Sequence, residues 1–213
     1  MSLYADHIFP RLMDRVMRTP HFQEQRQKAL SQVFGKVLEI GFGTGLNLPH
    51  YPNTVTWLTA IEPGHLLAKR VAERSVNLAM PVEVFRYRAE TLPWEDQRFD
   101  CAVSTWTLCT IRDPLRALNE IRRVLKPGGK FIFLEHGRSD DPKVARWQNI
   151  LNPFQRLFAC GCHLNRRIDR LIEDSGLTVE YLDRFVMEGV PRPGADMYRG
   201  VARPKQASQS TDR

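Results

Sequence analysis

The sequence predicts an α/β domain built on a doubly wound, mostly parallel sheet. Two observations lead to this fold class. Apolar runs of strand length alternate with segments of helical periodicity between residues 36 and 136, as in strands joined by crossover helices. A turn with three glycines follows the first apolar run directly, where such a sheet binds its ligand. The 213 residues, 42% of them hydrophobic, suffice for one domain with a sizeable core.

The expected elements follow one another in a regular order. Residues 1–34 carry polar and apolar residues at helical spacing, interrupted at Pro10, and are expected to form a helical cap. Five core strands are expected, at Lys36–Ile40, Val55–Ile61, Val82–Arg86, Asp100–Ser104 and Lys130–Glu135. Helices are expected at His65–Leu78 and Pro114–Leu125, with a turn at Lys126–Gly129. Residues 36–136 thus form the core of the domain.

The C-terminal part completes the sheet differently. Residues 137–166 break the alternation and are expected to be a lid or substrate insert. Three elements are expected in residues 167–204: a helix at Arg167–Asp174 and strands at Thr178–Phe185 and Met197–Ala202. The two strands form an antiparallel hairpin, which brings the expected sheet to seven strands. Residues 205–213 have no apolar anchor and are expected to be a flexible tail, so residues 1–204 form a single domain.

A glycine turn and two acidic residues point to a nucleoside ligand. Glu39 precedes Gly41, Gly43 and Gly45, and only glycine lets the backbone come so near a ligand. Glu62 closes the next apolar run, about 20 residues past the turn, where a carboxylate accepts hydrogen bonds from both ribose hydroxyls. Together these features predict a cofactor that contains adenosine.

The glycine spacing and the local charge narrow the choice of cofactor. Folds that bind dinucleotides favour G-x-G-x-x-G, but here the third glycine comes one residue early and Leu46 stands at the final position. The carboxylate of Glu39 would also oppose a pyrophosphate. A negative charge in this place suits a cationic ligand instead.

The E-x-G-x-G-x-G segment resembles motif I of the class I S-adenosylmethionine (SAM) methyltransferases. Three later segments resemble, in the right order, segments of the type 11 subgroup: Arg88–Trp94, Phe99–Ser104 and Glu120–Gly129. The resemblance covers roughly residues 36–136. It implies a Rossmann-like fold, SAM as the methyl donor and S-adenosylhomocysteine as the product.

The strand ends and the resemblance together predict the cofactor site. The expected binding residues are Glu39, Gly41, Gly43, Gly45, Asn47, Glu62, Pro63, Ala89, Glu90 and Thr105. Glu135 also falls at a strand end and is expected near the same pocket. Arg88 stands where the family often has an Asp that reaches adenine, and an arginine accepts no hydrogen bond. Either Glu90 or the backbone at Ala89 is left to hold adenine.

The acceptor is less closely defined. Residues 134–137 and 161–166 resemble the thiol S-methyltransferase branch, which implies a small hydrophobic acceptor such as a thiol. Phospholipid N-methyltransferases and quinone-precursor C-methyltransferases share the core motifs and remain alternatives, as does a SAM-binding scaffold without turnover. His136 follows the fifth strand and is the predicted catalytic base, because the pKa of histidine lies near neutrality.

Other partners are not predicted. Cys160, Cys162 and His163 lack a second ligand pair at zinc spacing, so no metal site is expected. No nucleic acid is expected either, because no RNA-binding module is visible and the net charge of +7 is weak evidence. Aromatic and arginine residues of the insert allow peripheral membrane contact, and the oligomeric state stays open. Few cysteines, no apolar span and no visible leader point to a cytoplasmic protein.

Overall fold

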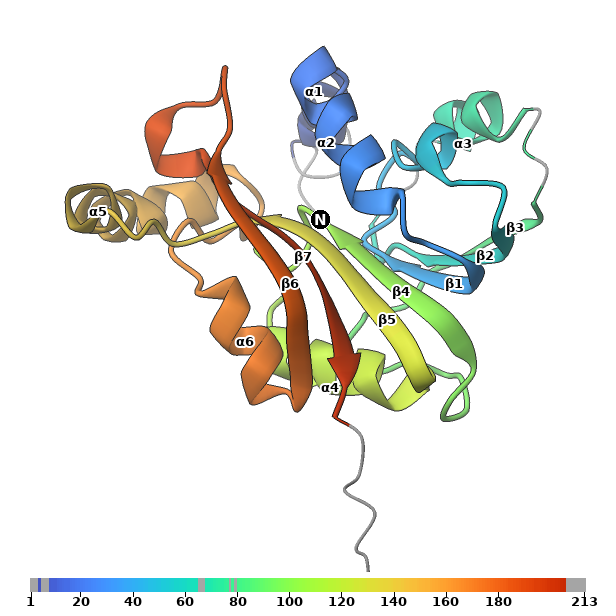
Figure 1. The fold of residues 1–213 in the computed structure, drawn as a ribbon. Helices are drawn as coiled ribbons and strands as arrows, with labels where there is room; N and C mark the ends of the chain where they lie inside the picture. The colour runs from blue at the N-terminus through green and yellow to red at the C-terminus, as the bar shows by residue number, and fades with distance from the viewer. Residues whose placement is uncertain (1–3, 5–7, 65–67, 77, 79, 206–213) are drawn as a thin grey trace, which may run out of the picture.

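The computed structural model describes residues 4, 8–64, 68–76, 78 and 80–205 (Figure 1). Its centre is a seven-stranded sheet in the order β3-β2-β1-β4-β5-β7-β6. Strands β1 to β5 run parallel, whereas β7 is antiparallel to both of its neighbours. The predicted α/β class, the seven strands and the antiparallel C-terminal hairpin are therefore confirmed.

The strands are β1 (Gly35–Ile40), β2 (Val55–Ile61), β3 (Val82–Phe85), β4 (Phe99–Thr105), β5 (Leu125–His136), β6 (Leu177–Val186) and β7 (Asp196–Pro204). The α-helices are α1 (Phe9–Val16), α2 (Pro20–Leu30), α3 (Ala68–Ser75), α4 (Pro114–Val124), α5 (Pro142–Phe158) and α6 (Ile168–Asp174). Two short 3₁₀ helices are η2 (Leu48–His50) and η3 (Arg192–Gly194).

The strand boundaries agree with the expected ones to within one or two residues, except at the start of β5. The expected turn at residues 126–129 lies inside this strand as a bulge. Leu125 pairs with Phe99, but the next pair joins Lys130 to Cys101, so extra residues loop out of the ladder. Gly128 supplies a positive φ of 77° in this bulge.

The helices differ more from the expectation. Pro10 does not interrupt the N-terminal helix but lies in its first turn, where the missing N–H costs nothing. The described part of the helix expected at His65–Leu78 is shorter, at residues 68–75, and residues 65–67 and 77 lie outside the described residues. Residues 206–213 of the expected tail also lie outside them.

The expected insert at residues 137–166 is mostly a helix of 17 residues, α5. The carboxylate of Asp141 accepts a hydrogen bond from the backbone N–H of Lys143 at 2.8 Å and so caps the first turn. Pro153 lies inside this helix. In the described part of the chain, no helix combines the length and the apolar character that crossing a bilayer requires.

The central strands are buried on both faces, as expected for a parallel sheet between helices. Leu38 and Ile40 point to the face that packs on α4 and α6. Val37 and Leu58 point to the opposite face, together with Leu30 of α2. Figure 1 shows these two helical layers, with α1 and α5 above the carboxyl ends of the parallel strands. Residues of α1, α5 and the strand ends line one cavity.

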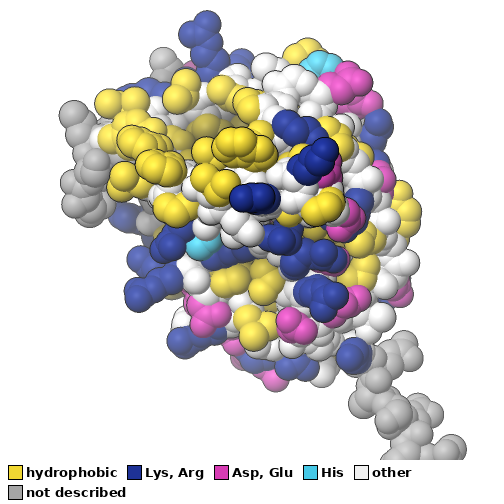
Figure 2. All heavy atoms as spheres, turned by 90° about the vertical axis from the view of Figure 1, so that its left-hand side faces the viewer, with side chains coloured by type: hydrophobic (Ala, Val, Ile, Leu, Met, Phe, Trp, Pro, Cys, Tyr) yellow, Lys and Arg dark blue, Asp and Glu magenta, His cyan; other side chains and the backbone are white. Residues whose placement is uncertain are grey.

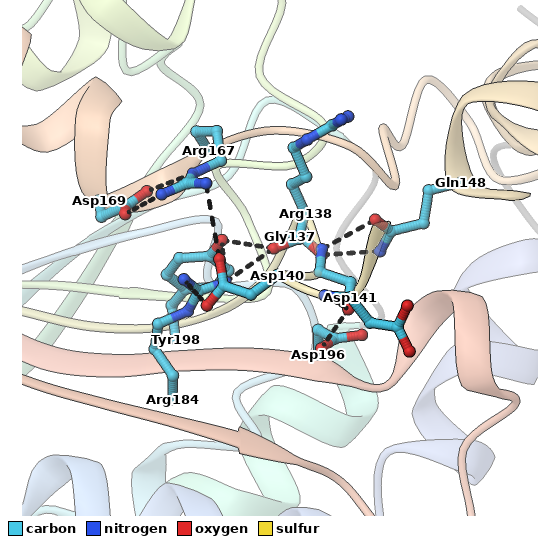
Figure 3. A network of polar contacts seen from close by, with 11 residues as sticks. Gly137, Arg138, Asp140, Asp141, Gln148, Arg167, Asp169, Arg184, Asp196 and Tyr198 are labelled. Atoms are coloured by element: carbon cyan, nitrogen blue, oxygen red, sulfur yellow. Dashed lines mark hydrogen bonds and ion pairs between the residues drawn. The ribbon is translucent and has the colours of Figure 1, made fainter. Parts of the chain in front are cut away.

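A network of polar contacts attaches the start of α5 to the sheet (Figure 3). The fully buried amide of Gln148 donates to the carbonyl of Gly137 and accepts from the N–H of Ser139, both at 2.9 Å. The hydroxyl of Tyr198, on β7, donates to the carbonyl of Arg138 at 2.5 Å. These contacts fix α5 relative to the carboxyl end of β5, and with it one wall of the site.

Candidate functional site

The loop after β1 turns through glycines with positive φ angles. The φ angles are 68° at Gly41 and 56° at Gly43, a region that residues with a side chain rarely adopt. A Cβ on Gly41 would lie only 2.1 Å from Oγ1 of Thr107, so no larger residue fits there. Gly41 and Gly43 line a cavity at the strand ends. Gly45 shapes the turn behind them and is not among the lining residues.

Glu39 is buried at the floor of this cavity, and its two oxygens have separate partners. Oε1 accepts a hydrogen bond from Asn47 at 2.8 Å, and Oε2 accepts one from the hydroxyl of Tyr51 at 2.7 Å. Burial raises the pKa of Glu39 to about 7, although these two hydrogen bonds and the charge of Arg26 act to lower it. Asn47 does not reach the cavity surface and instead orients Glu39.

Arg26 of α2 is a buried cation beside Glu39, and it lines the cavity. Its Nη1 donates to Oδ1 of Asn47 at 2.6 Å and to Oγ1 of Thr105 at 3.0 Å. Its guanidinium lies 4.8 Å from the ring centroid of Trp106, within cation–π distance. Burial lowers the pKa of Arg26 to about 10, so it is charged at neutral pH. Asn47 thus bridges the guanidinium of Arg26 and the carboxyl group of Glu39.

Glu62 follows β2 and closes the other side of the glycine loop. Its two carboxylate oxygens accept hydrogen bonds from the backbone N–H groups of Gly43 and Gly64, each at 2.9 Å. A carboxylate has about four lone-pair positions, so two remain for other donors. Glu62 and Pro63 both line the cavity, as the sequence predicts.

The loop after β4 is held in place by the carboxylate of Glu135. This buried carboxylate accepts hydrogen bonds from the hydroxyl of Ser104 at 2.5 Å and from the backbone N–H groups of Thr107 and Leu108 at 3.1 Å. Burial raises the pKa of Glu135. Glu135 does not line the cavity, contrary to the expectation, because its carboxylate is bonded to Ser104 and to the backbone of the loop.

The same loop holds Trp106 in a strained backbone conformation. Its φ of 50° is uncommon for a residue with a bulky side chain. The indole packs against Phe22 of α2, with 5.2 Å between ring centroids, and lines the cavity next to Thr105. Strain of this kind is frequent at functional sites.

The predicted adenine segment also lies at the cavity. Ala89 is buried, Glu90 is half-buried, and both line the cavity together with the exposed Arg88. Oε1 of Glu90 accepts a long hydrogen bond from the N–H of Asp113 at 3.5 Å. One oxygen of Glu90 therefore remains available.

The N-terminal cap is tied to the glycine loop through Asp14. This buried carboxylate accepts hydrogen bonds from the hydroxyl of Thr44 at 2.5 Å and from Arg74 of α3 at 2.8 Å. Arg70, also on α3, forms a further ion pair with it. Asp14 thereby connects three segments, α1, the glycine loop and α3.

The cavity has a volume of about 1000 Å³ and extends from these polar groups to an apolar end. Apolar residues of α1 and α5 line this end, among them Phe9, Met13, Val16, Leu151, Phe154 and Phe158. Phe154 and Phe158 are also more than half exposed, as is Trp147 on the outer face of α5. Figure 2 shows hydrophobic side chains gathered on the face that carries α5, beside a band of Lys and Arg side chains.

His136 meets two cysteines at the inner wall of the apolar end. Its Nε2 lies 3.1 Å from Sγ of Cys162, and the ligand atoms of Cys109, His136 and Cys162 all lie within 4.8 Å of one another. All three residues are buried, and all line the cavity. The hydrogen bond with Cys109 and, to a lesser degree, the one with His136 lower the pKa of Cys162. The hydrogen bond with Cys162, together with burial, raises the pKa of Cys109. Burial alone would lower the pKa of His136, but Cys162 outweighs it and the pKa is raised.

Backbone hydrogen bonds bring these three residues together. The N–H of His163 donates to the carbonyl of Cys109 at 2.9 Å, which places Cys162 beside Cys109. The N–H of Leu108 bonds Glu135, which precedes His136 in β5. The sequence singled out Cys162 and His136 separately but did not predict that they are in contact.

Of the ten predicted cofactor residues, eight line the cavity: Glu39, Gly41, Gly43, Glu62, Pro63, Ala89, Glu90 and Thr105. Asn47 and Gly45 lie behind them. Sequence reasoning missed Asp14 and Arg26, because a charged residue on a helix surface usually faces water and no local pattern marks these two as buried.

Comparison with known proteins identifies the family. Residues 38–133 match the family described as a methyltransferase domain. Thiol S-methyltransferase TMT1B of Rattus norvegicus is 33% identical over 142 residues, covering 64% of this chain and 57% of the relative. Phosphatidylethanolamine N-methyltransferase of Cereibacter sphaeroides is 31% identical over 147 residues, covering 68% of this chain and 71% of the relative. The chain thus spans little more than half of the rat protein.

Solved structures share the fold. A chain solved in complex with the Haloferax volcanii Trm112 methyltransferase activator superposes with a TM-score of 0.69 over 92% of this chain and 98% of that chain, at 18% identity. A SAM-dependent methyltransferase from Thermotoga maritima superposes with a TM-score of 0.63 over the same shares, at 24% identity. At these identities the structures establish the fold, and the sequence relatives establish the family. The chain belongs to the S-adenosylmethionine-dependent methyltransferases.

Proposed function

We propose that this protein transfers the methyl group of SAM to the sulfur of a small apolar thiol. One observation carries the proposal: a single cavity of about 1000 Å³ joins the carboxylates of Glu39 and Glu62 to an apolar end between α1 and α5. The polar end has the size and charge for a cationic nucleoside. The apolar end has the character for a hydrophobic acceptor.

On the donor side, each predicted residue has a definite task. The free lone pairs of Glu62 accept hydrogen bonds from the ribose hydroxyls, and Glu39 attracts the cationic part of SAM. Gly41 and Gly43 let the backbone approach the ligand, and Pro63 and Thr105 complete the walls. The backbone of Ala89 or the free oxygen of Glu90 holds adenine, because Arg88 cannot accept a hydrogen bond.

The charges of the reaction favour a thiol in this cavity. Transfer to a thiolate converts a cation and an anion into two neutral thioethers, so the charges disappear as the new bond forms. An apolar, water-poor site favours such a reaction, whereas transfer to a neutral amine only moves the positive charge. Sulfonium is a good leaving group, so the protein mainly has to align donor and acceptor.

The acceptor end supports the same choice. Thiol S-methyltransferase TMT1B of the rat is similar to this chain, at 33% identity. His136, the predicted base, lies at this end of the cavity, but its Nε2 already contacts the sulfur of Cys162. We therefore assign His136 to the acceptor site together with Cys109 and Cys162, rather than to the role of an isolated base.

A phospholipid amine is the second candidate acceptor. Trp147, Phe154 and Phe158 of α5 are exposed, and the face that carries α5 shows hydrophobic side chains beside a band of Lys and Arg side chains (Figure 2). Such a face would suit the surface of an anionic membrane. The similar protein from Cereibacter sphaeroides is named a phosphatidylethanolamine N-methyltransferase. This candidate predicts that activity depends on a lipid surface.

A methyl-transfer assay separates the candidates. The protein is incubated with SAM labelled in its methyl group and with one acceptor at a time: an alkyl thiol, the alcohol of the same carbon skeleton, vesicles of phosphatidylethanolamine, or a quinol precursor. We expect labelled thioether from the thiol and no product from the alcohol, because a thiol ionises far more readily. Turnover should not require vesicles.

Two results would overturn the proposal. Label that enters only the lipid amine or only the quinol carbon would reassign the acceptor to the corresponding alternative. Tight binding of SAM with no turnover on any acceptor would indicate a SAM-binding scaffold.

A further inference from the structure

We propose that Cys109, His136 and Cys162 bind a zinc ion, with a fourth coordination position that faces the acceptor end of the cavity. The identity of the fourth ligand, an acceptor thiol, rests on the proposed function. The metal site itself does not, because it follows from the three side chains alone.

The geometry of the three side chains suits zinc. Their ligand atoms lie within 4.8 Å of one another, and Nε2 of His136 lies 3.1 Å from Sγ of Cys162. A tetrahedral zinc ion holds two sulfur ligands about 3.8 Å apart and a sulfur and a nitrogen about 3.5 Å apart. Small side-chain movements therefore suffice to place an ion between the three atoms.

The chemistry of the donor set selects the metal. Two thiolates and an imidazole are soft and borderline ligands, which favour zinc over magnesium or calcium. Two cysteine thiolates and a neutral histidine also balance the charge of Zn²⁺, so the buried centre carries no net charge. Three protein ligands with one open position are the arrangement of catalytic zinc sites rather than of structural ones.

The protein backbone holds the three ligands in place from separate elements. His136 ends β5, where its neighbour Gly137 donates to the carbonyl of Asp196 at 3.0 Å. The segments that carry Cys109 and Cys162 are joined by the hydrogen bond from His163 to Cys109. Such a preorganised site loses little entropy when the ion binds.

In the sequence, no metal site was expected on Cys160, Cys162 and His163, which are neighbours along the chain and lack a second ligand pair. The structure separates them. Cys160 is exposed, and His163 is half-buried, whereas Cys162 turns inward to Cys109 and His136. A site assembled from three distant segments has no spacing signature in the sequence.

At the fourth position, the ion would activate the acceptor. A thiol that binds zinc loses its proton to solvent and becomes a bound thiolate. The thiolate sulfur attacks the methyl carbon of SAM, the bond from that carbon to the sulfonium sulfur breaks, and its electron pair stays on S-adenosylhomocysteine. The product is a neutral thioether, a weaker ligand than the thiolate, and it leaves the metal.

The first test is a cobalt titration of the metal-free protein, followed by its absorption spectrum. We expect one Co²⁺ per chain, with a thiolate-to-cobalt charge-transfer band and the intense d–d bands of a tetrahedral site. Cys162→Ser, Cys109→Ser and His136→Asn should each weaken Co²⁺ and Zn²⁺ binding by at least ~100-fold. Cys160→Ser is the matched control, because this cysteine is exposed and lies outside the cluster, and it should bind cobalt as the wild type does.

A second measurement tests the open position. Adding the alkyl thiol to the cobalt form should shift the d–d bands, and the matching alcohol should not. The affinity of Cys162→Ser for SAM, measured by calorimetry, should be unchanged. This result would show that the variant folds and that the donor site does not depend on the metal.

Two results would overturn the metal site and leave the proposed function standing: the absence of a charge-transfer band in the wild type, or the same band in Cys162→Ser. Methyl transfer unaffected by full removal of the metal with a chelator would overturn the activation of the acceptor by the ion. If the wild type does not bind SAM, the proposed function is contradicted instead.

Discussion

Asp14 in α1 accepts a hydrogen bond from the hydroxyl of Thr44 in the glycine loop, with 2.5 Å between the two oxygen atoms. The same carboxylate pairs with Arg70 and Arg74 of α3. The cap helix is therefore attached to the loop that we propose to hold SAM. Opening of the cap and loosening of the donor site should be linked.

The first prediction concerns this link. Asp14→Asn should lower the free energy of unfolding by about 2 kcal/mol, because Arg70 and Arg74 lose a buried anion but keep partial contact with water. It should also weaken SAM binding and speed proteolysis within α1. Urea denaturation, calorimetry and limited proteolysis measure these effects. Glu24→Gln removes an exposed pair with Lys28 on the neighbouring helix, and no change is expected. Equal effects of both substitutions would show that Asp14 has no special role.

The second prediction concerns pH and Glu39. The folded-state pKa of about 7 lies above the unfolded value near 4.5, so the favourable contribution of Glu39 is complete below pH 4.5 and is lost as the pH rises through 7. In the ligand-free protein, this loss should amount to about 3 kcal/mol. Denaturation at pH 4 to 8 gives the free energies of unfolding of the wild type and of Glu39→Gln. The difference between the two should change by about 3 kcal/mol over this range. A difference that does not vary with pH would contradict the raised pKa.

The third prediction separates backbone strain from crowding in the glycine loop. Gly41 and Gly128 both have positive φ angles, 68° and 77°, but a Cβ on Gly41 would clash with Thr107, whereas a Cβ on Gly128 would meet nothing within 4 Å. Both Gly→Ala changes should cost about 1 kcal/mol of stability from strain. Only Gly41→Ala should abolish SAM binding in calorimetry. If Gly41→Ala bound SAM normally, the loop would not form the donor site.

The fourth prediction concerns Gln148 and the wall formed by α5. Gln148→Ala leaves the carbonyl of Gly137 and the N–H of Ser139 without their buried partner, which should cost about 2 kcal/mol of stability. It should raise KM for the acceptor more than the Kd for SAM, because α5 lines only the acceptor end of the cavity. Arg146→Ala, at an exposed position of the same helix, is the control. An equal rise in KM for the acceptor and in Kd for SAM would indicate general unfolding rather than a movement of α5.

The sequence predicted the parts of the protein that local chemistry determines. The strands ending at Ile40 and Ile61 follow from apolar runs, and the glycine turn follows from residues that alone adopt its φ angles. Because the carboxyl ends of parallel strands meet at one edge, Glu39 and Glu62 were expected in one pocket, and both line it.

The sequence did not predict features that depend on tertiary packing. Asp14 and Arg26 are polar residues of helices, and only the position of those helices buries them. The contact of Cys109 with Cys162 depends on a hydrogen bond between two loops that are distant in sequence. Residues 137–166 were expected to form a lid or substrate insert, because they break the strand–helix alternation, and helix α5 within them was not predicted.

The measurement that tests the central claim most directly is calorimetric binding of SAM and S-adenosylhomocysteine to the wild type and to Glu62→Ala. We predict that the wild type binds both ligands and does not bind NAD(H). Glu62→Ala should lose about 2 kcal/mol of binding free energy with the ribose contacts, while Glu173→Ala, at an exposed position of α6, should bind like the wild type. Binding of NAD(H) by the wild type, or unchanged affinity in Glu62→Ala, would contradict the account.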